Sequence, residues 1–416
     1  MNKMIKSITS VKVTGRRVIV RAGFDVPLKS DNSKQITDNR HWKIADDTRV
    51  RDVLSTIKYL IAQKAKIIIM SHLGRPEGWD LDKSLWPAAE KLGELLDYKV
   101  VKITDHLPNY AIPHVNFLTS DITKHDYADL SHQIKSGEIL FLENLRFYPG
   151  EMDNDDKFIA KLASFGDVYV EEAFSVAHRK EASTVGLAKK LPAYGGVSLL
   201  KEIASLQKII KHPRSPFVLI MGGIKIEDKV ATIHNLAKEA AYIIVGGGIA
   251  NTFLKAAGFN VGKSKISDVM VAKDLIRNYK AKIVLPIDVV VATSVEAMPR
   301  AVNIEHVRSN DIILDVGPKS VRKYAGIIKE AKTLVWNGPF GILENPKYAH
   351  GSRAIALMFA MRSKGKAFGM VGGGETIEAL HQAKVVEYID HVSTGGGAML
   401  EFLAGKPLPA IKVLER

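Results

Sequence analysis

The chain has 416 residues, no cysteine and a formal net charge of +14 at pH 7. This length favours two domains over a single hydrophobic core. The absence of cysteine excludes disulfides, a thiolate nucleophile and a thiolate zinc site. No apolar run is long enough to span a bilayer, and the first residues lack the apolar core of a secretory signal. The 59 lysines and arginines are scattered, so nucleic-acid binding is not needed to explain the charge.

The first half contains apolar runs that end in cations. These runs are IIIMSHLGRP at 67–76, ILFLENLRF at 139–147 and VYVEEAFSVAHR at 168–179. Apolar residues recur at helical spacing in VRDVLSTIKYLI at 50–61, which predicts an amphipathic helix between strands. Taken singly, each cation is better explained as a surface or turn residue. Several of them at strand ends indicate a binding site for an anion.

A domain boundary is expected near 190–212, where a predicted helix lies between turn-forming residues. The second half then ends its apolar runs on glycines. The runs are FVLIMGGIKIEDK at 217–229, IIVGGGIA at 243–250, GMVGGGET at 369–376 and VSTGGGAM at 392–399. Glycine at a strand tip lets backbone amides approach a ligand, and a following helix adds its positive dipole end. The two halves together suggest a phosphate-rich molecule held between two lobes.

Strands and helices alternate along the whole chain, which predicts parallel sheets covered by helices on both faces. A second amphipathic helix is predicted in EDKVATIHNLAKEA at 227–240, with Asp228 as its N-cap. Ligands of such sheets bind beyond the carboxyl ends of the strands, where the glycines and arginines lie.

Two familiar motifs are incomplete. AGFNVGKS at 257–264 nearly matches a phosphate loop but follows a predicted helix instead of a strand, so a helix end at Gly258 is the better interpretation. No glycine triplet completes the dinucleotide fingerprint G-x-G-x-x-G, which makes an NAD-dependent oxidoreductase a weaker hypothesis. Neither G-x-S-x-G nor H-E-x-x-H occurs.

From about Val11 to its C-terminus the chain resembles the phosphoglycerate kinase family. The matching motifs are RAGFDVPL (21–28), DDTRV (46–50), SHLGRP (71–76), LENLRF (142–147), EEAFSVAHR (171–179), GGIKIEDK (222–229), VGGGIANTFLKAAG (245–258), LPIDVVVA (285–292), WNGPFGILE (336–344), VGGGET (371–376) and STGGGA (393–398). The resemblance implies two Rossmann-like α/β lobes joined by a hinge. We expect an N-terminal 3-phosphoglycerate lobe at 1–198 with a returning segment at 405–416, and a nucleotide lobe at 199–404.

The implied activity is reversible phosphoryl transfer between 1,3-bisphosphoglycerate and MgADP, giving 3-phosphoglycerate and MgATP in glycolysis. The implied enzyme is a cytoplasmic monomer that binds no membrane and no nucleic acid. The residues expected to bind 3-phosphoglycerate are Gly23, Asp25, Arg49, His72, Arg75, Arg146 and Arg179, with His178 nearby. The residues expected to bind the nucleotide are Lys201, Gly222, Gly223, Lys229, Asn337, Glu344, Gly372, Gly373, Gly374, Glu375 and Thr376. Arg49, Lys225, Gly374 and Gly397 are the expected catalytic groups, and Glu375 is expected to approach Mg²⁺.

The chain departs from the family pattern at several positions. The usual R-V-D-F-N-V-P reads Arg-Ala-Gly-Phe-Asp-Val-Pro at 21–27, so that Gly23 lacks the expected carboxylate and Asp25 adds one two residues later. N-D-A-F reads Glu-Glu-Ala-Phe at 171–174, Glu375 replaces the usual aspartate, and the loop at 29–45 is longer than usual. We expect Asp25 to compensate for Gly23. The alternative is a catalytically weakened kinase-like protein that binds RNA or an acidic protein.

Overall fold

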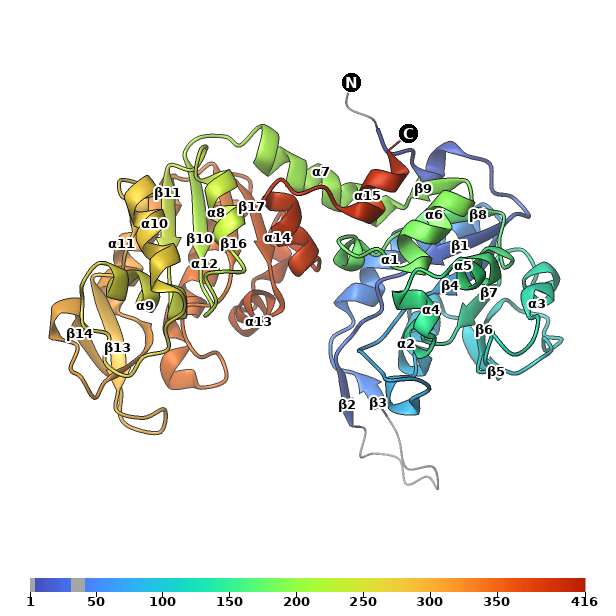
Figure 1. Ribbon diagram of the computed structural model, residues 1–416, viewed down its shortest axis with the longest axis horizontal. Coiled ribbons are helices and arrows are strands. Elements are labelled where there is room, and N and C mark those ends of the chain that lie inside the picture. Colours follow the sequence, from blue (N-terminus) through green and yellow to red (C-terminus); the bar gives the residue numbers. More distant parts are fainter. Residues whose placement is uncertain (1–3, 31–41, 416) are drawn as a thin grey trace. The chain divides into compact units, whose positions relative to one another are not determined.

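The computed structural model describes residues 4–30 and 42–415 (Figure 1). They form two units, residues 1–203 with 407–416 and residues 204–406. Among the described residues, no helix has the length and apolar character needed to cross a membrane.

The first unit is built on a seven-stranded parallel sheet in the order β5-β6-β7-β4-β1-β8-β9. The strands are β1 (Arg17–Arg21), β4 (Lys66–Met70), β5 (Lys99–Ile103), β6 (His114–Leu118), β7 (Ile139–Leu142), β8 (Val168–Glu171) and β9 (Ala193–Gly195). The helices are α1 (Thr48–Ala62), α2 (Trp86–Leu96), α3 (Ala128–Gln133), α4 (Pro149–Met152), α5 (Asp156–Ala163), α6 (Leu187–Lys190) and α15 (Pro409–Leu414). Side chains on both faces of β1 and β4 are fully buried, because helices cover both faces (Figure 1).

Helix α1 confirms the amphipathic helix predicted from the sequence. Val50, Val53, Ile57 and Leu60 are buried in the core between α1 and the sheet, together with residues of α2. Residues 28–30 and 42–44 pair as a small antiparallel hairpin of β2 (Leu28–Ser30) and β3 (Trp42–Ile44). The rest of the long loop noted in the sequence, 31–41, lies outside the described residues.

The C-terminal segment packs on the first unit. The amide of Ala410 in α15 donates to the Ala177 carbonyl at 3.1 Å, and Glu415 forms a β-bridge with Ile5. The chain therefore leaves this unit once and returns to it at its end.

The second unit has a six-stranded parallel sheet in the order β12-β11-β10-β16-β17-β18 and a three-stranded antiparallel sheet β14-β13-β15. The strands are β10 (Phe217–Met221), β11 (Tyr242–Val245), β12 (Ile283–Val284), β13 (Asp288–Ala292), β14 (Arg300–Asn303), β15 (Ile312–Val316), β16 (Thr333–Asn337), β17 (Phe368–Gly372) and β18 (His391–Ser393). The helices are α8 (Val230–Leu236), α9 (Gly247–Ala256), α10 (Val269–Tyr279), α11 (Pro318–Glu330), α12 (His350–Ser363), α13 (Gly374–Ala383) and α14 (Gly397–Leu403). As expected, the glycine motifs lie at the carboxyl ends of β10, β11, β17 and β18.

The N-cap predicted for α8 is wrong. This helix begins at Val230, its N-cap is Lys229, and no side chain caps it. Asp228 instead lies within the preceding turn, where the amides of Lys229 and Val230 both donate to the carbonyl of Ile226. The helix also ends earlier than its apolar pattern suggested, at Leu236. The predicted helix end at Gly258 is confirmed, since α9 stops at Ala256 and Gly258 has a φ of +93°.

Helix α7 (Val197–Lys211) runs across the boundary between the units, and a buried carboxylate holds its first turn. Glu172 accepts from the amides of Ser198 at 3.2 Å and Leu199 at 2.7 Å, and from the hydroxyl of Thr56 in α1. The Thr56 hydroxyl also accepts from the amide of Val197 at 2.8 Å. A Cβ on Gly196 would lie 2.2 Å from the Glu172 carboxyl carbon, so only glycine allows this approach.

Burial raises the pKa of Glu172 to about 7, despite the donors from Thr56, Leu199 and Ser198. As pH rises, the unfolded chain loses this proton first, near its ordinary pKa of about 4.5, and the folded chain loses it only near 7. Ionisation therefore favours the unfolded chain between these values. Glu172 lowers the free energy of unfolding across this interval by up to about 3 kcal/mol.

We predict that Glu172→Gln removes this pH dependence. The free energy of unfolding of the variant minus that of the parent should increase between about pH 5 and pH 8, because only the parent carries the destabilising contribution of Glu172 and the other titrating groups are common to both chains. Urea unfolding followed by tryptophan fluorescence measures it, since Trp42, Trp79 and Trp86 all belong to the first unit. Glu90→Gln, at an exposed position in α2, is the matched control and should show no such trend. A difference for Glu172→Gln that stays constant or falls with pH would contradict the assignment.

Candidate active site

Four basic side chains of the first unit converge where parallel strands end. Arg21 is the last residue of β1, His72 follows β4, Arg146 follows β7 and Arg179 follows β8. These strands are neighbours in the order β7-β4-β1-β8, so their carboxyl ends form one edge of the sheet. The predicted grouping of His72, Arg146 and Arg179 is thus explained by the sheet topology.

His72 is buried and neutral. Burial lowers its pKa well below the ordinary value, and the charges of Arg21, Arg146, Arg179 and Arg49 lower it further. Arg21 lies 2.9 Å from His72 Nδ1 through its Nη2, and a guanidinium can only donate, so Nδ1 is the acceptor. The proton of the neutral ring is therefore on Nε2.

Glu181 holds two of the arginines together. Its Oε1 accepts from Arg146 Nη2 at 2.8 Å and from Arg179 Nη1 at 3.3 Å. Burial alone would raise the pKa of Glu181, but Arg21, Arg146 and Arg179 together hold it below the ordinary value. One carboxylate thus faces three guanidinium groups, and the cluster keeps an excess of positive charge.

Arg21 is oriented by buried polar groups. Its Nε donates to Ser183 Oγ at 2.7 Å and its Nη1 donates to the Ala22 carbonyl at 2.6 Å. Ser183 in turn donates to the buried carboxylate of Glu151 through both its hydroxyl, at 2.6 Å, and its amide, at 3.0 Å. These contacts fix the guanidinium behind His72, where it sets the tautomer of the ring.

Asp25 lies among these basic groups. Its Oδ1 accepts from the Gly74 amide at 2.9 Å, and its Oδ2 lies 3.7 Å from His72 Nε2 and 3.8 Å from Arg49 Nη1. The Asp25 side chain is 40% exposed, so one side of the carboxylate faces solvent. A Cβ on Gly23 would have only ordinary contacts, the nearest at 3.5 Å from Ser175 Oγ, so this glycine is not required by packing.

The glycine loops of the second unit meet at the carboxyl ends of β10, β16 and β17. Lys229 donates to the Gly222 carbonyl at 2.9 Å, and Asn337 Nδ2 donates to the Gly372 carbonyl at 2.8 Å. Thr376 Oγ1 accepts from the Gly338 amide at 2.7 Å. Gly373 caps α13 with a φ of +95°, a backbone conformation that favours glycine. Three of the predicted nucleotide residues, Lys229, Asn337 and Thr376, therefore fix the loops instead of extending freely into solvent.

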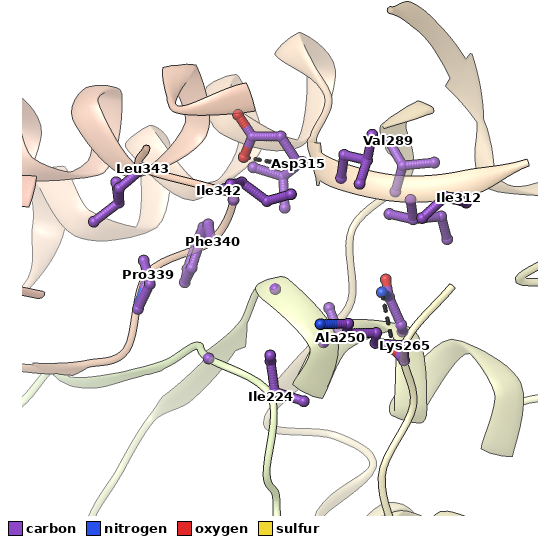
Figure 2. Close-up of a pocket in the computed structure, with 18 of the residues that line it drawn as sticks. Ile224, Ala250, Lys265, Val289, Ile312, Asp315, Pro339, Phe340, Ile342 and Leu343 are labelled. Atoms are coloured by element: carbon purple, nitrogen blue, oxygen red, sulfur yellow. Dashed lines mark hydrogen bonds between the residues drawn. The ribbon is translucent and has the colours of Figure 1, made fainter. Parts of the chain in front are cut away.

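An apolar pocket of about 450 Å³ opens beside these loops (Figure 2). Ile224, Pro339, Phe340, Ile342 and Leu343 line it on one side, and Val289 and Ile312 of the antiparallel sheet line it on another. The predicted residues Gly223, Glu344 and Glu375 also border it. Its shape and apolar lining suit a flat heterocycle with polar groups at the rim.

Asp315 is a buried carboxyl in the wall of this pocket. It accepts from the amides of Gly351 and Val316 at 2.8 and 2.9 Å, and burial raises its pKa to about 7 in spite of these donors. Asp315 was not predicted from the sequence, because a single aspartate in an apolar run carries no motif.

The remaining predicted residues are exposed or lie apart. Arg75 and Lys225 are exposed, and a Cβ on Gly374 or Gly397 would meet nothing within 4 Å. Lys201 is exposed in the part of α7 that belongs to the first unit, whereas the pocket belongs to the second. In the described part of the chain no three histidine or acidic side chains group as a metal site.

Several supporting residues were not predicted as site residues. Arg21, Glu151, Glu181 and Ser183 lie behind the basic cluster, and Asn251, Lys263 and Lys265 border the pocket of the second unit. Only Arg21 carried a usable signal, since a charged residue ends a buried strand there.

Comparison with known proteins gives one consistent result. A family model described as phosphoglycerate kinase matches residues 8–406. The phosphoglycerate kinase of Desulfosudis oleivorans is 41% identical over 421 residues, and that of Borrelia turicatae is 40% identical over 420 residues; each match covers at least 99% of both chains.

Solved structures agree with the sequence comparison. Phosphoglycerate kinase from Coxiella burnetii matches with a TM-score of 0.81 and 35% identity, over 99% of both chains. The enzyme from Pyrococcus horikoshii OT3 has the same TM-score at 29% identity, over 99% of this chain and 98% of its own. With a match along nearly its whole length, the chain belongs to the phosphoglycerate kinase family.

Proposed function

We propose that the basic cluster of the first unit binds 3-phosphoglycerate and that the glycine loops and apolar pocket of the second bind the nucleotide. The chain is a phosphoglycerate kinase, a phosphotransferase with a carboxyl group as acceptor (EC 2.7.2.3). It transfers a phosphoryl group reversibly between 1,3-bisphosphoglycerate and MgADP in glycolysis, giving 3-phosphoglycerate and MgATP. The observation that carries the proposal is the excess of guanidinium charge around the neutral His72.

In the first unit, the arginines neutralise the phosphate and carboxylate of 3-phosphoglycerate. Arg146, Arg179 and the exposed Arg75 offer planar pairs of donors, which bind such groups bidentately. His72 adds a neutral Nε2–H donor, which keeps its role over the physiological pH range because the ring does not titrate there. We assign the hydroxyl of the substrate to Asp25, since Gly23 offers no side chain.

In the second unit, the apolar pocket receives the adenine and Glu344 accepts from the ribose hydroxyls. The loop at 372–376 binds the phosphates, with Asn337, Thr376 and Lys229 holding the loops in place. The amides of Gly222 and Gly223 donate to the carbonyls of Asn337 and Pro339, so these two glycines contribute close approach of the backbone to the nucleotide. Lys201 is assigned to the nucleotide from the family resemblance alone.

Phosphoryl transfer needs alignment and neutralisation more than covalent chemistry from the protein. Lys225, Arg49 and the first-turn amides of Gly374 and Gly397, at the starts of α13 and α14, supply that neutralisation at the equatorial oxygens. Because the substrates bind to separate units, the units must close around them and expel water. We place the hinge at 195–205, where Gly195 and Gly196 precede α7.

The nucleotide is used as its Mg²⁺ complex, and the metal supplies charge neutralisation of the phosphates. Glu375 is the one predicted protein group, exposed in the first turn of α13 at the rim of the pocket. A single carboxylate suits Mg²⁺, which keeps several waters and takes its other ligands from phosphates. We propose a cytoplasmic monomer. Binding of RNA or an acidic protein finds no support, because the chain matches phosphoglycerate kinases along nearly its whole length.

We predict that Arg49→Ala lowers kcat about 10²- to 10³-fold, because a donor to the transition state is lost. The dissociation constant of MgATP should change less than about threefold, since Arg49 belongs to the first unit and the nucleotide pocket to the second. Steady-state kinetics and calorimetry measure the two effects. Arg51→Ala is the matched control, because Arg51 lies on the same helix and pairs with Asp47 at the surface. Equal losses in turnover and in MgATP binding would refute a transition-state role for Arg49.

We predict that Asp25→Ala weakens 3-phosphoglycerate binding about ten- to a hundredfold, because a charged hydrogen-bond acceptor for the hydroxyl is lost. Adding Gly23→Asp should restore part of the affinity, since a side chain has room at this position. The KM for 3-phosphoglycerate and direct titration report both changes. Tighter binding by Asp25→Ala would show instead that this carboxylate only repels the anionic substrate.

A further inference from the structure

The antiparallel hairpin of the first unit connects two residues of the proposed substrate site. Asp25 comes shortly before β2 and Arg49 shortly after β3, and Arg49 Nη1 donates to the Asp25 carbonyl. The two strands extend away from the main sheet beside α2 (Figure 1). Trp42 pairs with Ser30 at the end of the hairpin that is away from these two residues. Because the hairpin joins Asp25 to Arg49, any movement of its strands displaces both side chains.

The loop that follows β4, residues 73–85, is fixed at both ends by one side chain. Asn144 Oδ1 accepts from the Leu73 amide at 3.2 Å. Its Nδ2 donates to the carbonyls of Leu73 and Lys83, at 2.8 Å in each case. The loop after β4 is therefore a firm support for any segment that binds to it.

Hydrogen bonds join the hairpin segment to this loop near both ends of the loop. Near the start, the Gly74 amide donates to Asp25 Oδ1 at 2.9 Å. Near the end, Asp82 Oδ1 accepts from Trp42 Nε1 at 3.3 Å. Packing restrains the hairpin less, since the apolar side chains of its two strands are only partly buried against the core. Loss of the Trp42 bond would weaken the hold on the hairpin at the point farthest from Asp25.

We infer that Trp42 is a positioning residue for phosphoryl transfer, which keeps Asp25 and Arg49 in place for 3-phosphoglycerate through its hydrogen bond to Asp82. The inference rests on the proposed function, which assigns the substrate hydroxyl to Asp25 and neutralisation of the moving phosphoryl group to Arg49. Small displacements of such groups lower the rate strongly, because the reaction depends on alignment. The nucleotide pocket belongs to the second unit, so MgATP binding should not depend on Trp42.

Substitution of the two partners measures the contribution of their bond to catalysis. Trp42→Phe keeps an aromatic ring without the donor, and Asp82→Ala removes the acceptor. Each variant should lower kcat/KM for 3-phosphoglycerate about three- to tenfold, and the double variant should lose no more than either single one. Asp82→Asn retains a carbonyl acceptor and should stay within about twofold of the parent. The Kd of MgATP, measured by calorimetry, should be the same in all of them.

The variant Asp25→Ala separates positioning from a general loss of stability. Trp42→Phe should raise the KM for 3-phosphoglycerate in the parent. In Asp25→Ala this rise should fall below about twofold, because the carboxylate that Trp42 positions is absent. The fall in kcat should persist there, since Arg49 is still present. A purely structural role of Trp42 would change both constants equally in the two backgrounds.

Glu77→Ala is the matched control for Asp82→Ala. It removes a carboxylate from an exposed position of the same loop, and thus makes the same change in charge. Its effect on kcat/KM should be additive with that of Trp42→Phe.

Two results would overturn the inference while leaving the proposed function intact. One is a kcat/KM for Trp42→Phe equal to that of an active parent, and the other is full additivity of Trp42→Phe and Asp82→Ala. Absence of turnover in the parent itself would refute the proposed function and the role of Trp42 together.

Discussion

The arrangement of the basic cluster in the first unit depends on one feature, the gathering of guanidinium groups around the neutral His72. Arg21, Arg146 and Arg179 share the single carboxylate of Glu181, which leaves an excess of positive charge at the sheet edge. Such a cluster is stable only if buried partners orient its side chains. Arg21 donates to Ser183, and Ser183 donates to Glu151. The unbalanced charge is what a phosphorylated acid would complete, and the same arginines lower the pKa of His72.

Much of this arrangement could be predicted from the sequence because its signals are local. Buried strands ending in cations or glycines were confirmed at β4, β7, β8, β10, β11, β17 and β18, and the parallel sheets follow from the alternation with helices. The cap of α8 was not predictable, since a tight turn from Ile226 competes with Asp228 for the start of the helix. Glu181, Asp315 and Asn251 were not predicted, because their importance comes from contacts distant in sequence or from burial in a pocket wall.

Two departures from the family pattern are matched by contacts with neighbouring residues. Gly23 carries no side chain, whereas the Asp25 carboxylate accepts from the Gly74 amide and lies 3.7 Å from His72 and 3.8 Å from Arg49. Glu172 places a longer acidic side chain where it caps α7, and Gly196 gives it the space. In both places the changed side chain has hydrogen-bond partners or space that neighbouring residues provide.

The central claim is that the two units act together as a kinase of 3-phosphoglycerate. The most direct test is the rate of MgATP-dependent phosphorylation of 3-phosphoglycerate, coupled to glyceraldehyde-3-phosphate dehydrogenase and followed as loss of NADH. We expect saturable turnover in the ordinary enzyme range, about 1–10³ s⁻¹. No NADH loss from a chain that still binds MgADP would contradict the account, because the second unit would then work while the arginine cluster served another ligand.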